Sequence, residues 1–315
     1  MNSPFFPAKL LLFGEYSIVI GGRGLAIPLP LYGGTLGIAT PAVMRQSQGI
    51  RESNDRIREL KDYLQQLQAD NALLCNFNFP LFEAHVASGL YFNATIPAGY
   101  GLGSSGSLCA AVYQSYAHQP IVYEHTFSGH NLPQLRSIFA QMEAFFHGAS
   151  SGIDPLVCYL KQPLLISSNT QMETAYLATI KEQPFRLFLY DTGSPRPAHA
   201  HLVPLFVSKT QDAHFKELCQ LQLNLFNNNC ITALFEGKAQ DLVTNFERLS
   251  LFQLEHFLPM IPDAVIPLWQ QGLHTGQYYL KLCGAGGGGF MLGFSLHPHA
   301  TEQLLGKNKV QWLEW

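Results

Sequence analysis

The segment from Pro97 to Ser107, PAGYGLGSSGS, is the part of the chain best suited to hold a phosphate. It lies between an alternating run at 91–96 that predicts a strand and a run at 108–113 that predicts a helix. Glycine lets the backbone approach a ligand closely. The free N–H groups of a first helical turn, with the helix dipole behind them, favour an anion. A tight turn closed by a serine cap is the weaker interpretation, because four glycines lie in this short stretch.

Four charged residues could do chemistry beside such a loop. Lys9 and Glu15 interrupt an apolar segment, and a charge in a buried strand is costly unless it is paired. A Lys9 head that reaches water at a strand end is an equal alternative. Glu143 borders the apolar face of a helix expected over 132–148, so it lies either on the surface or towards a cleft. Asp154 precedes a proline, which by itself indicates only a turn.

The elements that must position these residues follow from periodicity and turn signals. We expect strands at 9–13, 17–20, 25–29, 185–190, 278–283 and 290–294, and helices at 51–74, 132–148, 210–226, 239–249, 251–257 and 263–275. The glycine run at 284–289 is too long for a minimal hairpin, which indicates either close approach of a ligand or flexibility. We place the domain boundary near 161–185, giving an N-terminal domain of 1–165 and a C-terminal domain of 166–315.

Composition narrows the class of partner. Hydrophobic residues make up 47% of the 315 residues, which predicts a packed globular protein. A net charge of −3 without a basic block argues against nucleic acid and favours a small-molecule substrate. Six cysteines without a C-x-x-C pair predict reduced thiols in a cytoplasmic protein. We expect no signal peptide and no membrane span, and the low surface charge is compatible with a homodimer.

Three stretches together resemble the motifs of the GHMP kinase superfamily, in the same order. They are KLLLFGEY at 9–16, PAGYGLGSSGS at 97–107 and KLCGAGGGG at 281–289, so the resemblance covers the whole chain. Within the superfamily, residues 143–154 resemble the E…HG..SG[VI]D pattern of the mevalonate kinase family, with the same spacing from glutamate to aspartate. Asp191-Thr192-Gly193 resembles a D-[TS]-G that members carry after a strand.

Two departures from the pattern, at Tyr16 and Ala8, concern the substrate more than the reaction class. Tyr16 stands where mevalonate kinases often have a histidine that contacts substrate, and GEY and YGLGSSGS are closer to phosphomevalonate kinases. Ala8 replaces the usual glycine before the motif lysine, and Cys283 stands where threonine is common. The acceptor therefore stays open between mevalonate and phosphomevalonate.

The resemblance implies an α+β fold of two domains, with the active site in the cleft between them. The N-terminal domain would be like ribosomal protein S5 domain 2 and the C-terminal domain ferredoxin-like. The implied activity is ATP-dependent phosphorylation of mevalonate to 5-phosphomevalonate, in the mevalonate pathway of isoprenoid biosynthesis. Phosphomevalonate kinase, another GHMP small-molecule kinase and a catalytically idle ligand-binding member are the alternatives.

The resemblance also implies residue roles. Asp154 would face the acceptor hydroxyl, with Lys9 beside it. Because a neighbouring cation favours a charged carboxylate, Asp154 would be ionised at neutral pH. Ser105 and Glu143 would bind Mg²⁺ through oxygen atoms. ATP would contact Pro97, Gly99, Gly101, Leu102, Gly103, Ser104, Ser105, Gly106 and Ser107. The substrate would contact Glu15, Tyr16, Gly152, Asp154, Arg196, Gly284, Ala285 and Gly286.

Overall fold

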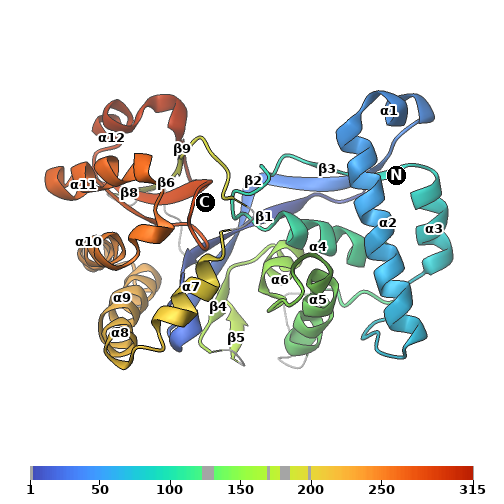
Figure 1. Ribbon diagram of the computed structural model, residues 1–315, viewed down its shortest axis with the longest axis horizontal. Coiled ribbons are helices and arrows are strands. Elements are labelled where there is room, and N and C mark those ends of the chain that lie inside the picture. Colours follow the sequence, from blue (N-terminus) through green and yellow to red (C-terminus); the bar gives the residue numbers. More distant parts are fainter. Residues whose placement is uncertain (1–2, 123–130, 169–170, 178–184, 198–199, 315) are drawn as a thin grey trace. The chain divides into compact units, whose positions relative to one another are not determined.

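Helices and antiparallel strands are mixed along the chain, which confirms the α+β class (Figure 1). The computed structural model describes residues 3–122, 131–168, 171–177, 185–197 and 200–314. The chain forms two compact units. The first consists of Met1–Lys9, Pro28–Pro97 and Gly103–Gln162, and the second of Leu10–Ile27, Ala98–Leu102 and Pro163–Trp315. The division expected at residue 165 stays a prediction, and residues 169–170 and 178–184 of the expected boundary lie outside the described ranges.

The first unit is built around the buried helix α4 (Ser104–Tyr116). Its elements are α1 (Pro41–Gln46), α2 (Gln48–Ala69), α3 (Phe79–Ala87), β3 (Leu90–Ala94), α4 (Ser104–Tyr116), α5 (Asn131–His147), α6 (Ile153–Leu160) and parts of β1 (Phe6–Phe13) and β2 (Gly24–Ile38). β3 pairs antiparallel with the end of β2. α4 is buried on every side from residue 106 to 113, as an apolar core helix should be. α5 and α6 both pack against it.

The second unit is built on a four-stranded antiparallel sheet of order β7-β8-β6-β9. The strands of this sheet are β6 (Arg186–Asp191), β7 (Tyr278–Leu282), β8 (Phe290–Ser295) and β9 (Val310–Trp312). The unit also contains β4 (Leu164–Ile166), which pairs with the start of β2, and β5 (Met172–Thr174), which pairs with β4. Its helices are η1 (Ile18–Ile20), α7 (Leu202–Lys209), α8 (Ala213–Leu218), η3 (Cys219–Leu223), α9 (Asn224–Phe235), α10 (Ala239–His256), η4 (Leu258–Met260), η5 (Asp263–Val265), α11 (Ile266–Thr275), α12 (Pro298–Leu305) and η6 (Lys307–Lys309). β7 and β8 pair directly, with the glycine run at 284–289 between them.

The prediction of a strand at 17–20 is wrong, because this segment forms the 3₁₀ helix η1. Contacts with α9 override the β-branched sequence Ile-Val-Ile. The Ser17 hydroxyl donates to Asn224 Oδ1 at 2.6 Å, and Asn224 donates to the Ile20 carbonyl. Farther along the same turn, Asn227 donates to the Arg23 carbonyl, and the Arg23 N–H donates to Asn228. α9 therefore holds the backbone that follows the first motif.

The helices predicted at 239–249 and 251–257 form one helix, α10. The helix continues through Ser250, whose buried hydroxyl accepts a hydrogen bond from Trp269 Nε1 at 2.8 Å. Sequence reasoning missed α7 altogether, and the helix predicted at 210–226 begins later and continues beyond that range into α9.

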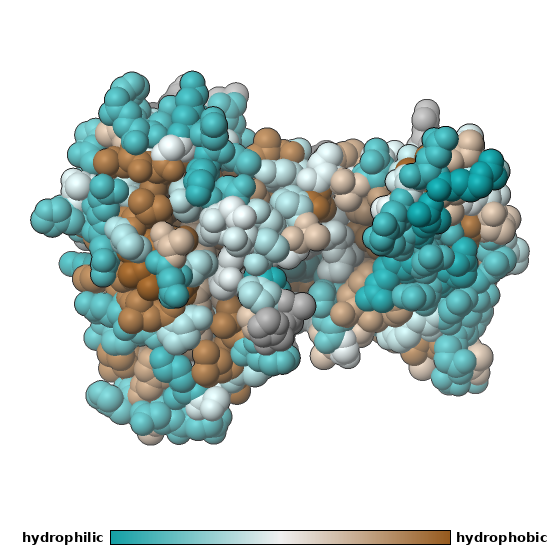
Figure 2. Space-filling model, turned by 45° about the horizontal axis from the view of Figure 1, so that its top comes forward, coloured by the Kyte–Doolittle hydropathy of each residue, from teal (hydrophilic) through white to brown (hydrophobic). Residues whose placement is uncertain are grey.

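Over the second unit, Figure 2 shows apolar residues interrupting the polar surface. The exposed large apolar side chains of this unit include Val203, Leu205, Val207, Leu221 and Leu225. Single exposed apolar residues are ordinary on globular proteins and need no partner to explain them.

Candidate active site

The first unit joins Lys9 and Asp154 in an ion pair. Lys9 Nζ lies 2.7 Å from Asp154 Oδ1, and the two side chains are 8% and 31% exposed. Lys9 comes from the buried strand β1, and Asp154 from the first turn of α6. The pairing compensates the cost of burying the lysine, so neither a Lys9 head in water nor an isolated turn at Asp154 describes this geometry.

The N-terminus of α4 begins against this ion pair. Gly103, its N-cap, has φ +70°, and a Cβ there would lie 3.2 Å from Asp154 Oδ2. At Gly106 a Cβ would meet the Pro155 nitrogen at 2.7 Å, closer than real contacts allow. The two glycines therefore let the first turns of α4 and α6 lie side by side, and the first N–H groups of a helix have no partner within the helix itself.

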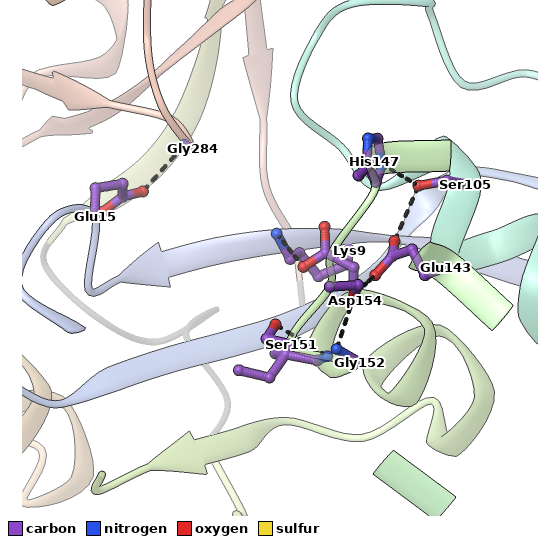
Figure 3. Close-up of polar contacts among 11 residues, drawn as sticks. Lys9, Glu15, Ser105, Glu143, His147, Ser151, Gly152, Asp154 and Gly284 are labelled. Carbon is purple, nitrogen blue, oxygen red and sulfur yellow. Dashed lines mark hydrogen bonds and ion pairs between the residues drawn. The ribbon is translucent and has the colours of Figure 1, made fainter. Parts of the chain in front are cut away.

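Glu143 of α5 is buried next to the same turns and is only 4% exposed, so it is not a surface glutamate. Its Oε1 accepts a hydrogen bond from Ser105 Oγ at 2.9 Å, and its Oε2 accepts a short one from Ser150 Oγ. His147 Nε2 lies 3.1 Å from the Ser105 hydroxyl. Figure 3 shows the side chains of Lys9, Ser105, Glu143 and Asp154 gathered in one place. The catalytic roles expected of Lys9 and Asp154 and the metal-binding roles expected of Ser105 and Glu143 stay predictions.

Burial raises the pKa of Glu143 to about 7, and the Asp154 charge adds to this, against hydrogen bonds from Ser150 and Ser105 and the Lys9 charge. A carboxyl whose pKa is raised above its unfolded value favours the folded state below about pH 4.5, and that contribution is lost as pH rises through about 7. We expect Glu143→Gln to remove about 1–3 kcal/mol of this pH dependence from the unfolding free energy of the ligand-free protein. Urea unfolding at several pH values measures this dependence. The prediction is contradicted if the unfolding free energy of Glu143→Gln changes with pH as it does in the native protein.

The segment predicted to bind phosphate is divided between the two units. Pro97 and residues 103–107 belong to the first unit, and residues 98–102, including Gly99, Gly101 and Leu102, belong to the second. Ser104 is exposed in the first turn of α4. Ser107 is fully buried and donates to the Phe6 carbonyl at 2.9 Å, so its side chain is used to hold α4 against β1.

In the second unit, a buried ion pair lies at the start of the glycine run. Lys281 Nζ is 2.7 Å from Glu15 Oε2, and the side chains are 0% and 1% exposed. The Gly284 N–H donates to Glu15 Oε1 at 3.4 Å (Figure 3). Lys281 Nζ also donates to the Leu282 carbonyl. Glu15 and Gly284, which were both predicted to bind substrate, are therefore in contact.

Tyr16 forms a hydrogen bond with Ala285, the next residue of the glycine run. Its hydroxyl donates to the Ala285 carbonyl at 2.6 Å, and its ring packs against Phe206 and Phe257. The residue is 5% exposed, and burial raises the pKa of its phenol. Its hydroxyl thus already has a protein partner in the second unit.

The other end of the glycine run is held by the turn after β6. Thr192 Oγ1 donates to the Gly289 carbonyl and the Gly289 N–H donates to the Ser194 carbonyl, each at 2.7 Å. The Gly287 N–H donates to Met260 in the same way, and a Cβ at Gly286 would meet the Met260 carbonyl at 2.5 Å. This run is a fixed loop rather than a flexible tether.

Arg196 and Gly99 complete this part of the second unit. The Arg196 N–H donates to the Gly99 carbonyl at 3.1 Å, and a Cβ at Gly101 would approach the Cys283 carbonyl at 3.5 Å. The second unit therefore brings Gly99 beside Arg196, three residues after the D-T-G sequence, and Gly101 beside Cys283 at the start of the glycine run. Gly152 belongs to the first unit, where it is the N-cap of α6.

Sequence reasoning missed three residues of these clusters. Lys281 could have been found, because a lysine inside an apolar strand is the signal that singled out Lys9. His147 and Ser150 gave no signal beyond their place in the 143–154 segment. Both become visible only through their contacts with Ser105 and Glu143.

Comparison with known proteins gives a family-model match for part of the chain and a fold for nearly all of it. Residues 67–162 match the model of the GHMP kinases N-terminal domain. A mevalonate kinase of Thermococcus sibiricus is 28% identical over 163 residues, which are 48% of this chain and 47% of the relative. The chain thus spans about half the length of the curated relatives it matches.

Solved structures match over nearly the whole chain. Lactococcus lactis galactokinase complexed with galactose has a TM-score of 0.68 at 13% identity, covering 98% of this chain and 92% of that one. L. major mevalonate kinase in complex with R-mevalonate has a TM-score of 0.65 at 16% identity, covering 99% and 95%. At these identities the likeness concerns the fold. Among the described residues, no helix is both long and apolar enough to cross a membrane.

Proposed function

We propose that this chain is a kinase of the GHMP superfamily that transfers a phosphoryl group from ATP to the hydroxyl of mevalonate, giving 5-phosphomevalonate; the match to the GHMP kinases N-terminal domain and the mevalonate kinase relatives support this. The observation that carries the proposal is the cluster in the first unit, where the Lys9–Asp154 pair adjoins the start of α4 and the Ser105–Glu143 contact. The curated relatives named mevalonate kinase support this acceptor. The cytoplasmic location and the homodimer stay predictions.

Asp154 and Lys9 have different roles in the proposed transfer to the acceptor. Asp154 accepts the proton of the alcohol, which need leave only late in a loose phosphoryl-transfer transition state. A carboxylate is a far weaker base than an alkoxide, so it does not remove the alcohol proton completely before the attack. Lys9 orients Asp154 through the 2.7 Å contact and stabilises negative charge on the transferring group.

Ser105 and Glu143 form a donor set that fits Mg²⁺. The ion prefers hard oxygen ligands and is usually held by one or two carboxylates together with substrate phosphates. A buried carboxylate and an adjoining hydroxyl at a helix N-terminus supply that chemistry. Bound there, Mg²⁺ would neutralise charge on the phosphate oxygens. The N–H groups of the first turn of α4 would bind the same phosphates.

Glu143→Gln is expected to raise the Mg²⁺ concentration for half-maximal turnover by at least about tenfold, because an amide is a weaker ligand than a carboxylate. Steady-state ADP release at fixed ATP and increasing Mg²⁺ measures it. Glu173→Gln, which alters an exposed glutamate in β5, is the matched control. An unchanged Mg²⁺ dependence in Glu143→Gln would remove the residue from the metal site.

Phosphomevalonate is the second candidate acceptor, favoured by Tyr16 in place of the histidine common in mevalonate kinases. The burial of Tyr16 and its bond to Ala285 weaken that argument, because the side chain is engaged within the protein. The same contacts do not favour mevalonate positively. The acceptor is therefore a question for assay.

A coupled ADP-release screen with mevalonate, phosphomevalonate, homoserine and galactose tests the proposal. Turnover dependent on mevalonate supports it, and turnover with phosphomevalonate alone assigns the second candidate. Turnover with only homoserine or galactose would keep the kinase and replace its acceptor. No ATP turnover with any acceptor would favour an idle ligand-binding member of the superfamily.

A further inference from the structure

Ser150 lies in the turn between α5 and α6, and its hydroxyl contacts both sides of that turn. It donates to Glu143 Oε2 and accepts from the Gly152 N–H at 2.9 Å. Gly152 is the N-cap of α6, whose first turn carries Asp154. A single hydroxyl therefore ties the carboxylate of one helix to the start of the helix that carries the other carboxylate.

We infer that Ser150 is a positioning residue that holds Glu143 in the orientation needed to bind Mg²⁺ with ATP. The inference rests on the proposed function. Each oxygen of Glu143 accepts one hydroxyl, from Ser105 on Oε1 and from Ser150 on Oε2. Ser105 belongs to the proposed donor set, so its hydroxyl is needed by the ion. Ser150 lies outside that set and is the donor that remains for the carboxylate.

The contribution of Ser150 is conformational. Glutamate has three rotatable side-chain bonds, and fixing such a side chain costs rotamer entropy. A carboxylate held beforehand by a hydrogen bond has already lost that freedom when the ion arrives, which is the advantage of preorganisation. Because Ser150 is itself fixed by the Gly152 N–H, it serves as a rigid donor.

The neighbouring serine provides a matched comparison. The Ser151 hydroxyl accepts from the Ile153 N–H at 3.4 Å, and its carbonyl accepts from Arg136 Nε. These contacts support the same turn without reaching Glu143. If the turn alone mattered, losing either hydroxyl would have a similar effect, whereas the inference makes the two variants differ.

The test measures ATP binding by calorimetry at increasing Mg²⁺ without acceptor, and then turnover, for Ser150→Ala, Ser150→Thr and Ser151→Ala. We expect Ser150→Ala to raise the Mg²⁺ concentration for half-maximal ATP binding about tenfold, the lower end of effects from residues that orient metal ligands. Turnover at saturating Mg²⁺ and the KM for acceptor should change little. Ser150→Thr should restore the Mg²⁺ dependence, and Ser151→Ala should match the native protein.

A second pair of variants guards against loss of the fold. Ser150→Thr and Ser150→Val have nearly the same shape and differ in the hydroxyl, so a difference in their Mg²⁺ dependence isolates the hydrogen bond. Equal Mg²⁺ dependence in this pair, or equal shifts in Ser150→Ala and Ser151→Ala, would overturn the inference while the kinase proposal stands. Native protein that binds no ATP at any Mg²⁺ concentration would overturn both.

Discussion

Replacing Asp154 by asparagine is expected to leave ATP binding nearly intact and to lower turnover by at least about a hundredfold, the scale of a lost general base. Asparagine keeps the shape of the side chain and its oxygen beside Lys9, but it no longer accepts a proton from the alcohol. The Lys9–Asp154 pair also loses its charge balance, which weakens the orientation of Lys9. Calorimetry measures the ATP affinity and the coupled assay measures turnover.

Asp241→Asn is the control for this variant, because Asp241 is likewise an acid in the first turn of a helix, α10. It reports what a helix loses when such a charge is removed, which is typically 0.3–1 kcal/mol. Turnover near the native value in Asp154→Asn would exclude the residue from proton transfer. A loss of ATP binding as large as the loss of turnover would assign it to binding instead.

Lys281→Met is expected to lower the free energy of unfolding by about 3–5 kcal/mol at neutral pH, the usual cost of breaking a buried ion pair. Both partners are essentially inaccessible to solvent, so the variant would leave the Glu15 carboxylate buried without its cation. The backbone N–H groups of Gly284 and of Glu15 itself would then remain to stabilise the charge. Urea or thermal unfolding measures the loss.

The pH dependence of this variant identifies the mechanism. Burial already raises the pKa of Glu15 above 4.5, and removing Lys281 takes away the largest opposing effect. The carboxyl then favours the folded state only when protonated, so the stability of the variant should fall as pH rises from about 4.5. Lys238→Met, which removes the cation of an exposed pair with Glu236, should behave like the native protein. A Lys281→Met protein as stable as the native one would contradict the expectation.

Much of the candidate site could be predicted because its residues carry a recognisable pattern. The spacing of Glu143 and Asp154 on either side of a glycine turn, with a lysine in the first strand, resembles the pattern of the mevalonate kinase family. Charged residues in apolar runs also revealed Lys9 and Glu15 without any family. Ser150 could not be found this way, because a serine in a turn is common and its partner is a side chain on another element.

The errors in the predicted fold have a common cause in tertiary contacts. Residues 17–20 have a strand-like composition, but Asn224 fixes the backbone as a 3₁₀ turn from more than 200 positions away. The patterns at 239–249 and 251–257 are separated at Ser250, whereas α10 continues through this residue and its hydroxyl accepts a hydrogen bond from the indole of Trp269. Local propensity is a weak prior wherever a distant residue can satisfy the backbone or a polar side chain.

The composition of the two compact units limits how such a gene could be recombined. Residues 10–27 and 98–102 pack with the C-terminal half, where Glu15 meets Lys281, Arg23 meets Asn228 and Gly99 meets Arg196. After a crossover between homologous genes at residue 165, the two residues of each contact would come from different parent proteins. Functional chimaeras of this protein should therefore require the two N-terminal segments to be inherited together with the C-terminal half.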